Sequence, residues 1–262
     1  MVTCIFCGLW RPGSEEDVIS KWIRRALNPA TEVTIRAEPT GAVSRLQHLT
    51  VTLEDMVCQE CNNTWMSRLE NRGVKPFLEP MLTNKHAVTL DETQQRDLAR
   101  WAVIKVLLME HAMRQRRAHL RSTVGYAPSD PELAWLYGND DPPPRSRVWL
   151  GVFDARGRIL VSTQSRLLTS APTRGAAASV AAHMTTLTIG HVLLQVFSTN
   201  FVLADAGSVP AYDANPPQPY AQALSRIWPI ARSWLQWPPS THISPEILDK
   251  VVNWGQPTTQ RL

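Results

Sequence analysis

Two short stretches decide the fold of this chain: Cys4-Ile5-Phe6-Cys7-Gly8 near its start, and Cys58-Gln59-Glu60-Cys61-Asn62 about fifty residues later. Each stretch is a C-x2-C pair, and two such pairs supply the four thiolates of a tetrahedral Zn²⁺ site. The glycine after the first pair suits a tight turn around the ion. Sulfur would fill every coordination position, so the zinc is expected to be structural and not catalytic. The predicted ligands are Cys4, Cys7, Cys58 and Cys61.

The composition excludes several classes of protein. The chain has 262 residues, of which 44% are hydrophobic and 19% charged, so it is expected to be globular and not disordered. Its apolar runs are short and its start has no leader-like pattern, so we expect neither a transmembrane helix nor a signal peptide. Thiolate ligands require reduced cysteines, which favours a cytoplasmic protein. A net charge of +4 permits a polyanionic partner without demanding one.

Charge and cysteine content divide the chain into two predicted domains. Residues 1–83 hold all four cysteines and carry nine basic and ten acidic side chains, and residues 84–262 carry a net charge of +5. We therefore predict a zinc-binding domain over 1–83 and an α+β domain over 84–262. The second domain is predicted to open with a long buried helix over about 92–121. Asp91 and Gln94 stand in capping-box register before it.

Strand patterns follow this helix. Residues 147–153 and 158–163 are predicted to be two strands joined by a hairpin turn. The segment 185–199 is β-branched and apolar with Gly190 in its middle, which indicates one bent strand or two. Ser244 is predicted to begin a short final helix. The second domain is therefore expected to contain an antiparallel sheet.

Three polar groups each have two interpretations. Ser14 and the carboxylates after it are typical of a helix N-terminus, and those carboxylates are also suited to binding a metal ion. Asn62 and Asn63 either cap a helix that begins near Thr64 or serve a site. Four arginines at the end of the long helix are either solvated or contact phosphate: Arg114, Arg116, Arg117 and Arg121.

The region between the cysteine pairs resembles the HNH endonuclease family, in particular bacterial and phage proteins with a C-x2-C on each side of the motif. The family pattern is similar to E-H-V-x-P-x-W, and this chain has Glu16-Asp17-Val18-Ile19-Ser20-Lys21-Trp22. The family has His or Asn directly after the second pair, where Asn62 stands here. The longer match, from Val57 to Glu70 and at Lys75-Pro76, looks like an actinobacterial subgroup of HNH-like proteins. The resemblance covers residues 1–83 and fades through the long helix.

The resemblance implies a treble-clef (ββα-metal) module and a metal-dependent nuclease that hydrolyses phosphodiester bonds in DNA. Glu16 and Asn62 match the ligands of a catalytic Mg²⁺ or Mn²⁺ ion, and Asp17 stands in the place of the catalytic histidine. His48 lies between the cysteine pairs and is the candidate replacement base. The basic residues expected to help contact DNA, besides the four arginines of the long helix, are Lys21, Arg24, Arg25 and Arg68.

Asp17 leaves two functions open. Aspartate has an ordinary pKa of about 3.9, against about 6.5 for histidine, so it is a much weaker base at neutral pH. The first hypothesis is therefore an HNH-like nuclease, and the alternative is a catalytically inactive, zinc-binding interaction module for nucleic acid or protein. A protein partner or a homo-oligomer is compatible with either. The chain has no P-loop, G-x-G-x-x-G or G-x-S-x-G motif that would indicate a small-molecule enzyme.

Overall fold

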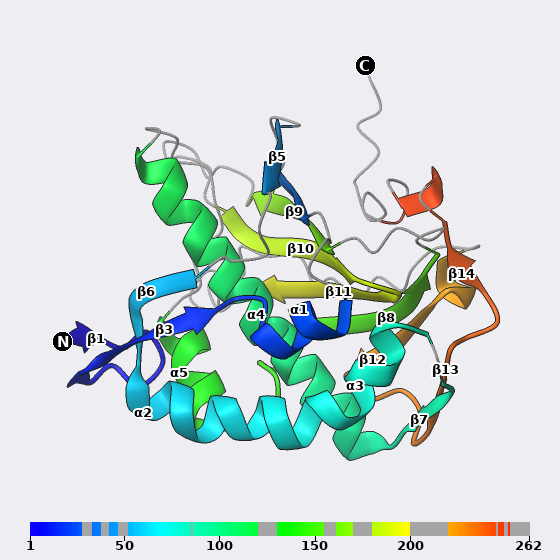
Figure 1. Ribbon diagram of the computed structural model, residues 1–262, viewed down its shortest axis with the longest axis horizontal. Coiled ribbons are helices and arrows are strands. Elements are labelled where there is room, and N and C mark those ends of the chain that lie inside the picture. The colour runs from blue at the N-terminus through cyan, green and yellow to red at the C-terminus, as the bar shows by residue number, and fades with distance from the viewer. Residues whose placement is uncertain are drawn as a thin grey trace.

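The computed structural model describes residues 1–27, 33–37, 42–46, 52–84, 86–119, 130–154, 161–169, 180–199, 220–244, 246–248 and 251. Helices and strands are mixed, so the predicted α+β class is confirmed. Helix α4 (Glu92–His119) crosses beneath a large sheet, and a second helical layer runs along the bottom of the molecule (Figure 1). No described helix is long and apolar enough to cross a lipid bilayer.

The large sheet has eight strands in the part of the chain that is described. Its order is β12-β8-β11-β10-β9-β4-β5, with β14 beside β8, and neighbours are antiparallel except in the pairs β4–β9 and β14–β8. Strands from both sides of residue 83 therefore share one sheet. The strands are β4 (Val33–Ala37), β5 (Ala42–Leu46), β8 (Arg147–Phe153), β9 (Val161–Thr169), β10 (Val180–Ile189), β11 (Val192–Thr199), β12 (Leu224–Trp228) and β14 (His242–Ile243).

The strand predictions are partly confirmed. The strand over 147–153 is β8, and of the two interpretations of 185–199 the two-strand one holds, because β10 and β11 form a hairpin around Gly190. The hairpin predicted between 147–153 and 158–163 is wrong, since β8 pairs with β11, β12 and β14 while β9 pairs with β10 and β4. A turn signal is local. Strands β8 and β11 are buried along almost their whole length, and they pair with each other inside the sheet.

Gly190 ties this hairpin to the helical layer. Its φ is +57°, in the left-handed region, and a Cβ there would collide with the carbonyl oxygen of Leu82. The next residue, His191, donates its backbone N–H to that same oxygen at 3.0 Å. Glycine is needed here because the hairpin and the end of the helical layer meet backbone to backbone.

The long helix is confirmed as α4, including its start. Gln94 N donates to Asp91 Oδ1 at 2.8 Å and Asp91 N donates to Gln94 Oε1 at 3.0 Å, which is a complete capping box. Its middle, residues 98–110, is buried between the sheet and the helical layer. After Ser244, residues 246–248 are helical, as predicted.

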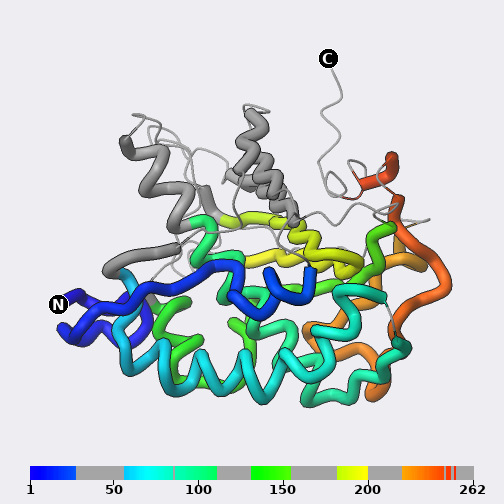
Figure 2. Tube along the Cα trace, viewed as in Figure 1, coloured from blue at the N-terminus to red at the C-terminus, as the bar shows by residue number. Residues whose placement is uncertain are grey.

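Besides β4 and β5 of the large sheet, the described N-terminal part consists of two small antiparallel pairs, one short helix and the helical layer. Strand β1 (Val2–Thr3) pairs with β2 (Trp10–Arg11), and β3 (Gly13–Asp17) pairs with β6 (Thr52–Cys58). Helix α1 (Lys21–Leu27) follows β3. The layer itself, called here the helical segment 59–82, runs without a break along the bottom of the trace (Figure 2). Its parts are α2 (Gln59–Cys61), two π-helical stretches, η1 (Asn62–Met66) and η2 (Leu69–Val74), and α3 (Lys75–Leu82).

Two of the capping interpretations are wrong. Residues 14–17 belong to strand β3, and Ser14 Oγ donates to Val57 O of the neighbouring strand at 2.9 Å instead of capping a helix. Asn62 and Asn63 lie inside the helical segment, whose cap is Cys58: its Sγ accepts from Cys61 N. Pairing with β6 makes residues 14–17 a strand, and the Cys58 cap starts the helix ahead of Asn62.

The core lies on both faces of the large sheet. One cluster of buried residues extends from Val2 to Trp237 and includes α1, the helical segment, α4 and one face of β8. A smaller cluster covers the opposite face and includes Trp149 and Phe153. The remaining described elements are β7 (Val88–Leu90), α5 (Asp130–Gly138), η3 (Tyr220–Gln222) and β13 (Leu235–Trp237). The boundary near residue 83 stays a prediction, and the larger core cluster extends across it.

Candidate metal centre and the adjoining pocket

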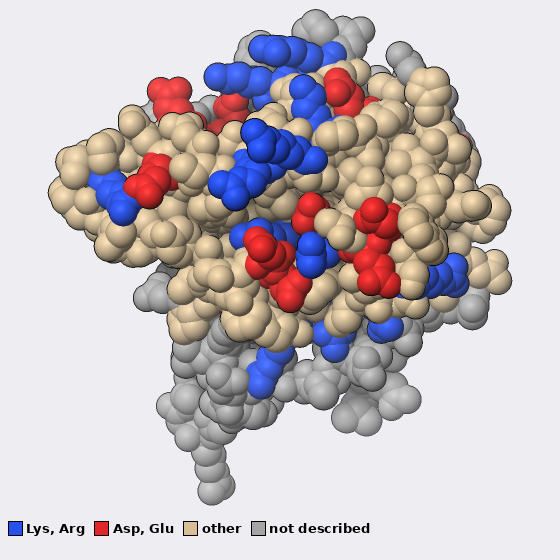
Figure 3. Space-filling view, turned by 90° about the horizontal axis from the view of Figure 1, so that it is seen from below, with Lys and Arg blue, Asp and Glu red and all other residues tan. Residues whose placement is uncertain are grey.

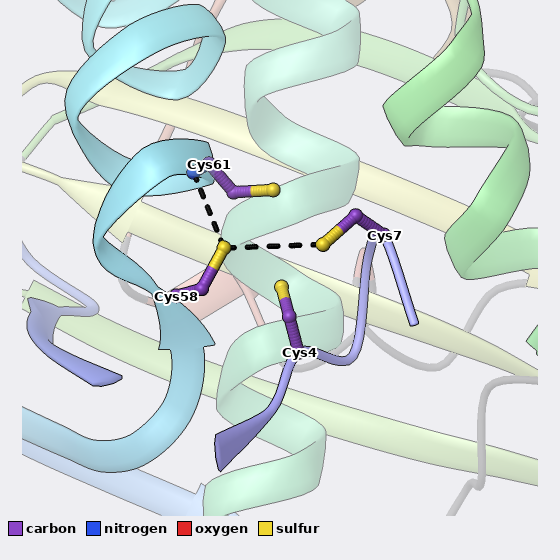
Figure 4. Close-up of side chains that lie close together, drawn as sticks. All are labelled: Cys4, Cys7, Cys58 and Cys61. Carbon is purple, nitrogen blue, oxygen red and sulfur yellow. Dashed lines mark hydrogen bonds between the residues drawn. The ribbon is translucent and has the colours of Figure 1, made fainter. Parts of the chain in front are cut away.

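The four cysteines converge on one point (Figure 4). Their sulfur atoms all lie within 4.8 Å of one another, and Cys7 Sγ and Cys58 Sγ are 3.9 Å apart. Two of the cysteines come from the turn between β1 and β2, where Gly8 has a φ of +70° and closes the loop by donating to Cys4 O at 2.9 Å. The other two come from the end of β6 and the first turn of the helical segment. The predicted ligand set therefore comes together as one possible metal site.

The electrostatics of this cluster fit a cation. None of the four thiols is oxidised to a disulfide. Burial raises the pKa of Cys61 and of Cys7. The pKa of Cys4 is instead lowered to about 7, because hydrogen bonds with the backbone of Cys7 and Cys58 outweigh the effect of burial. Four neighbouring thiolates repel one another unless a positive ion lies between them. Four converging sulfurs suit a soft, tetrahedral ion.

A polar pocket of about 350 Å³, called here the first pocket, adjoins this centre. It lies between β3, α1 and the helical segment. The predicted residues Glu16, Asp17 and Asn62 all line it, although Asn62 is distant from the other two in sequence. The described residues that line it are Glu15, Glu16, Asp17, Ser20, Lys21, Trp22, Arg25, Asn62, Asn63, Met66, Ser67, Glu70, Asn71 and Lys75.

Lys21 and Arg25, predicted to contact DNA, also line the first pocket, and the remaining predicted site residues lie elsewhere. Arg24 contacts Asp17 and does not line the first pocket, and Arg68 is exposed on the helical segment. His48 and Arg121 lie outside the described residues. Three arginines lie on the described backbone of α4, but their side chains fall outside the described part: Arg114, Arg116 and Arg117.

Lys105 of α4 is the main residue that the sequence analysis missed. Its side chain is 2% exposed, and its Nζ lies 2.8 Å from Glu16 Oε1 and 3.2 Å from Glu70 Oε2. It also donates to Asp17 O at 3.2 Å. The sequence does indicate that Lys105 has a special role, because it is the one charged residue in the apolar run from Trp101 to Met109. A lysine inside a buried helix needs a carboxylate partner.

The charged state of this network follows from its contacts. Burial alone lowers the pKa of Lys105, but Glu16 and Glu70 outweigh it and hold that pKa above its ordinary value. Burial raises the pKa of Glu70, but Lys105 and hydrogen bonds outweigh it, so the pKa lies below its ordinary value. One of those bonds comes from Trp22 Nε1 to Glu70 Oε1 at 2.7 Å. Lys105 and Glu70 are therefore both charged at neutral pH.

Asp17 and Asn62 also have partners. Arg24 donates to Asp17 Oδ2 at 3.1 Å. The Asn62 amide donates to Ser14 Oγ at 3.2 Å and to Glu15 O at 3.4 Å, so it fastens the helical segment to β3. Three of the four residues predicted as catalytic, all but His48, are thus held in place by neighbouring side chains and backbone.

The formal charges decide what the first pocket suits. Four carboxylates line it (Glu15, Glu16, Asp17 and Glu70), and so do three cations (Lys21, Arg25 and Lys75). Lys105 and Arg24 add two more cations through their ion pairs, which leaves this group of described residues one positive charge in excess. The face seen from below likewise carries basic and acidic side chains next to each other (Figure 3). With Glu16 and Asp17 both paired to cations, this arrangement does not fit a divalent metal ion.

Comparisons of the chain with family profiles, with curated proteins and with solved structures gave no match.

Proposed function

We propose that this chain is a zinc-stabilised relative of the HNH endonucleases that binds a phosphodiester of nucleic acid in the first pocket and has lost metal-dependent cleavage. The observation that carries the proposal is the position of Lys105 between Glu16 and Glu70. The ammonium group neutralises the Glu16 carboxylate, which in an active nuclease of this family would hold a divalent ion.

The order of elements supports the relationship. A two-cysteine turn precedes β3, β3 pairs with β6, and β6 leads directly through the second cysteine pair into a helix. This order agrees with the knuckle, strand pair and helix expected of a treble clef, with α1, β4 and β5 inserted between the two strands. Glu16 lies near the end of β3, and Asn62 lies one residue after the last cysteine. The resemblance assigns metal ligands to these two places.

Loss of cleavage is supported by energetics. To give Glu16 to a metal ion, the buried Lys105 would have to lose a partner, and breaking a buried ion pair costs about 3–5 kcal/mol. Asp17, at the position of the base, is held by Arg24. A phosphate, by contrast, meets the Lys21 and Arg25 side chains at the pocket wall together with amide and hydroxyl groups.

A metal-dependent nuclease is the second candidate, and one observation favours it. Glu16, Asp17 and Asn62 line the same pocket, beside the cysteine centre, as the family resemblance implies for an active site. Cleavage would then require that a metal ion displace Lys105 or Arg24 from a carboxylate.

Binding of a labelled single- or double-stranded oligonucleotide across a salt series tests the proposal. Each phosphate contact contributes a slope of about −0.7 to −0.9 to the dependence of log K on log salt. We expect Lys21→Gln and Arg25→Gln each to weaken binding and to flatten this slope by about one contact. Arg72→Gln is the matched control, because Arg72 is exposed on the helical segment and does not line the first pocket. Unchanged binding in both pocket variants would contradict the proposal.

A further inference from the structure

A second pocket, of about 620 Å³, lies between β12 and the chain that leads into and out of β13. This is the size range of sites that hold a drug-sized ligand. In Figure 1, β12 and β13 lie at the opposite end of the molecule's longest axis from β3 and β6. The second pocket is therefore separate from the first.

The walls of the second pocket are fixed by the fold. On one side, β12 is hydrogen-bonded to β8, and on the other, β13 pairs with β7. The connection between β12 and β13 is held as well, since Gln95 Nε2 donates to Arg232 O at 3.0 Å. A pocket with walls anchored in this way is formed before a ligand arrives.

The charged side chains that line the second pocket are all positive in the described part of the chain. Among the described residues that line it, the two charged side chains are both arginines, Arg226 and Arg232, and none is a carboxylate. Arg226 lies opposite Trp149 in the β12–β8 register, so the two side chains share a face of the sheet. The Nε of Arg226 is buried and makes no hydrogen bond to any described residue. This pocket therefore suits an anion.

Two tryptophans give the second pocket aromatic surface. Trp149 is 1% exposed and forms part of the floor, whereas Trp234 is 67% exposed at the rim. An indole left in water beside a cationic pocket offers a face on which a planar ring can stack, and stacking of a base on an aromatic side chain contributes about 1–3 kcal/mol. Glutamine and serine side chains in the lining add hydrogen-bonding groups: Gln222, Ser225, Gln236 and Ser240.

We propose that this second pocket binds a nucleoside phosphate, with the base against Trp234 and the phosphate on Arg226 and Arg232. Guanidinium groups bind phosphate through paired hydrogen bonds, and both charged groups of this pocket are guanidinium groups. The same chemistry is offered by a free nucleotide and by one nucleotide of a single strand. The inference does not depend on the function proposed for the first pocket.

Isothermal titration calorimetry of the full chain tests this with three small probes: AMP, adenosine and inorganic phosphate. We expect AMP to bind at least tenfold more tightly than either of the other two. Trp234→Ala, Arg232→Gln and Arg226→Gln should each weaken AMP binding at least tenfold. Trp10→Ala and Arg72→Gln are the controls, since both residues are exposed and lie outside this pocket.

Trp234 and Arg232 are exposed, so their variants should fold. The test therefore stays decisive even if the Arg226→Gln variant fails to fold. A 5′-phosphorylated single-stranded hexanucleotide identifies the source. Binding at least tenfold tighter than AMP, with the same loss in Trp234→Ala, would indicate a strand, and equal binding would indicate a free nucleotide. Absence of AMP binding at millimolar concentration, or binding that none of the three variants weakens, would overturn the proposal.

Discussion

At the scale of single residues, Lys105 links the helix α4 to the first pocket. Its ammonium group contacts two carboxylates that come from different elements, Glu16 of β3 and Glu70 of the helical segment. Burying three charged groups is favourable only when they are paired and hydrogen-bonded. Lys105 therefore fixes the spacing of β3 and the helical segment and balances the charge of two carboxylates that line the first pocket.

Lys105→Met should destabilise the protein by about 3–5 kcal/mol, because it leaves two buried carboxylates without a counter-ion. The loss should shrink as the pH falls toward the range in which carboxyl groups take up protons. Urea unfolding at pH 5 and pH 7 measures both effects. Lys21→Met is the control, since Lys21 is exposed. A Lys105→Met protein with wild-type stability at pH 7 would show that the network contributes nothing.

Glu70 should make stability depend on acid pH. Its folded pKa lies below its ordinary value, so its contribution is complete above the unfolded pKa, about 4.3 for glutamate, and is lost as the pH falls through the folded pKa. Glu70→Gln should lower stability by about 1.5–3 kcal/mol at pH 7 and flatten the decline below pH 4. Unfolding free energies from pH 3 to pH 7 test this against Glu79→Gln, a variant of an exposed residue on the same segment. An equally steep acid decline in Glu70→Gln would refute the assignment.

At the scale of elements, the sequence predicts a feature correctly where the residues in contact are close together in the chain. The capping box of α4 joins residues three apart, and the C-x2-C spacing fixes two sulfurs at once, so both could be predicted. Strand β3 could not, because Ser14 and the carboxylates after it favour a helix start, and only pairing with β6, about forty residues away, makes them a strand. The partner of β8 was missed for the same reason.

The metal centre should hold β1, β2 and the start of the helical segment together. Elemental analysis of protein purified without added metal is expected to find about one zinc ion per chain. Its removal by a strong chelator, or Cys61→Ser, should lower the melting temperature markedly, because binding free energy at a structural zinc site is also folding free energy. Asn63→Ser is the control. Metal-free wild-type protein that melts like the untreated sample would contradict the prediction.

At the scale of the whole molecule, the N-terminal part and the rest of the chain share contacts that no local pattern reveals. Strand β4, from residues 33–37, pairs with β9, and the larger core cluster runs from Val2 to Trp237. The ion pairs of Lys105 with Glu16 and Glu70 also cross the predicted boundary near residue 83. The candidate site was therefore predictable in part of its lining and not in the ion pairs that Lys105 of α4 makes with two of the lining carboxylates.

A fragment of residues 1–83 should consequently fail to fold on its own, even with zinc bound to its cysteines. It lacks Lys105 to pair its buried carboxylates and the apolar face of α4 to cover the helical segment. Circular dichroism and a two-dimensional amide NMR spectrum of the zinc-loaded fragment, beside the full chain, measure this. Dispersed resonances and a cooperative melt would instead establish residues 1–83 as an independent domain.

The most direct test of the central claim is plasmid cleavage by purified protein of known metal content, with Mg²⁺, Mn²⁺ or EDTA, beside Glu16→Gln. We predict no metal-dependent cleavage under any condition, because Lys105 holds the carboxylate that a catalytic ion would need. Cleavage that requires the added ion and disappears in Glu16→Gln, from protein that keeps its cysteine-bound metal, would contradict the account and establish a working nuclease.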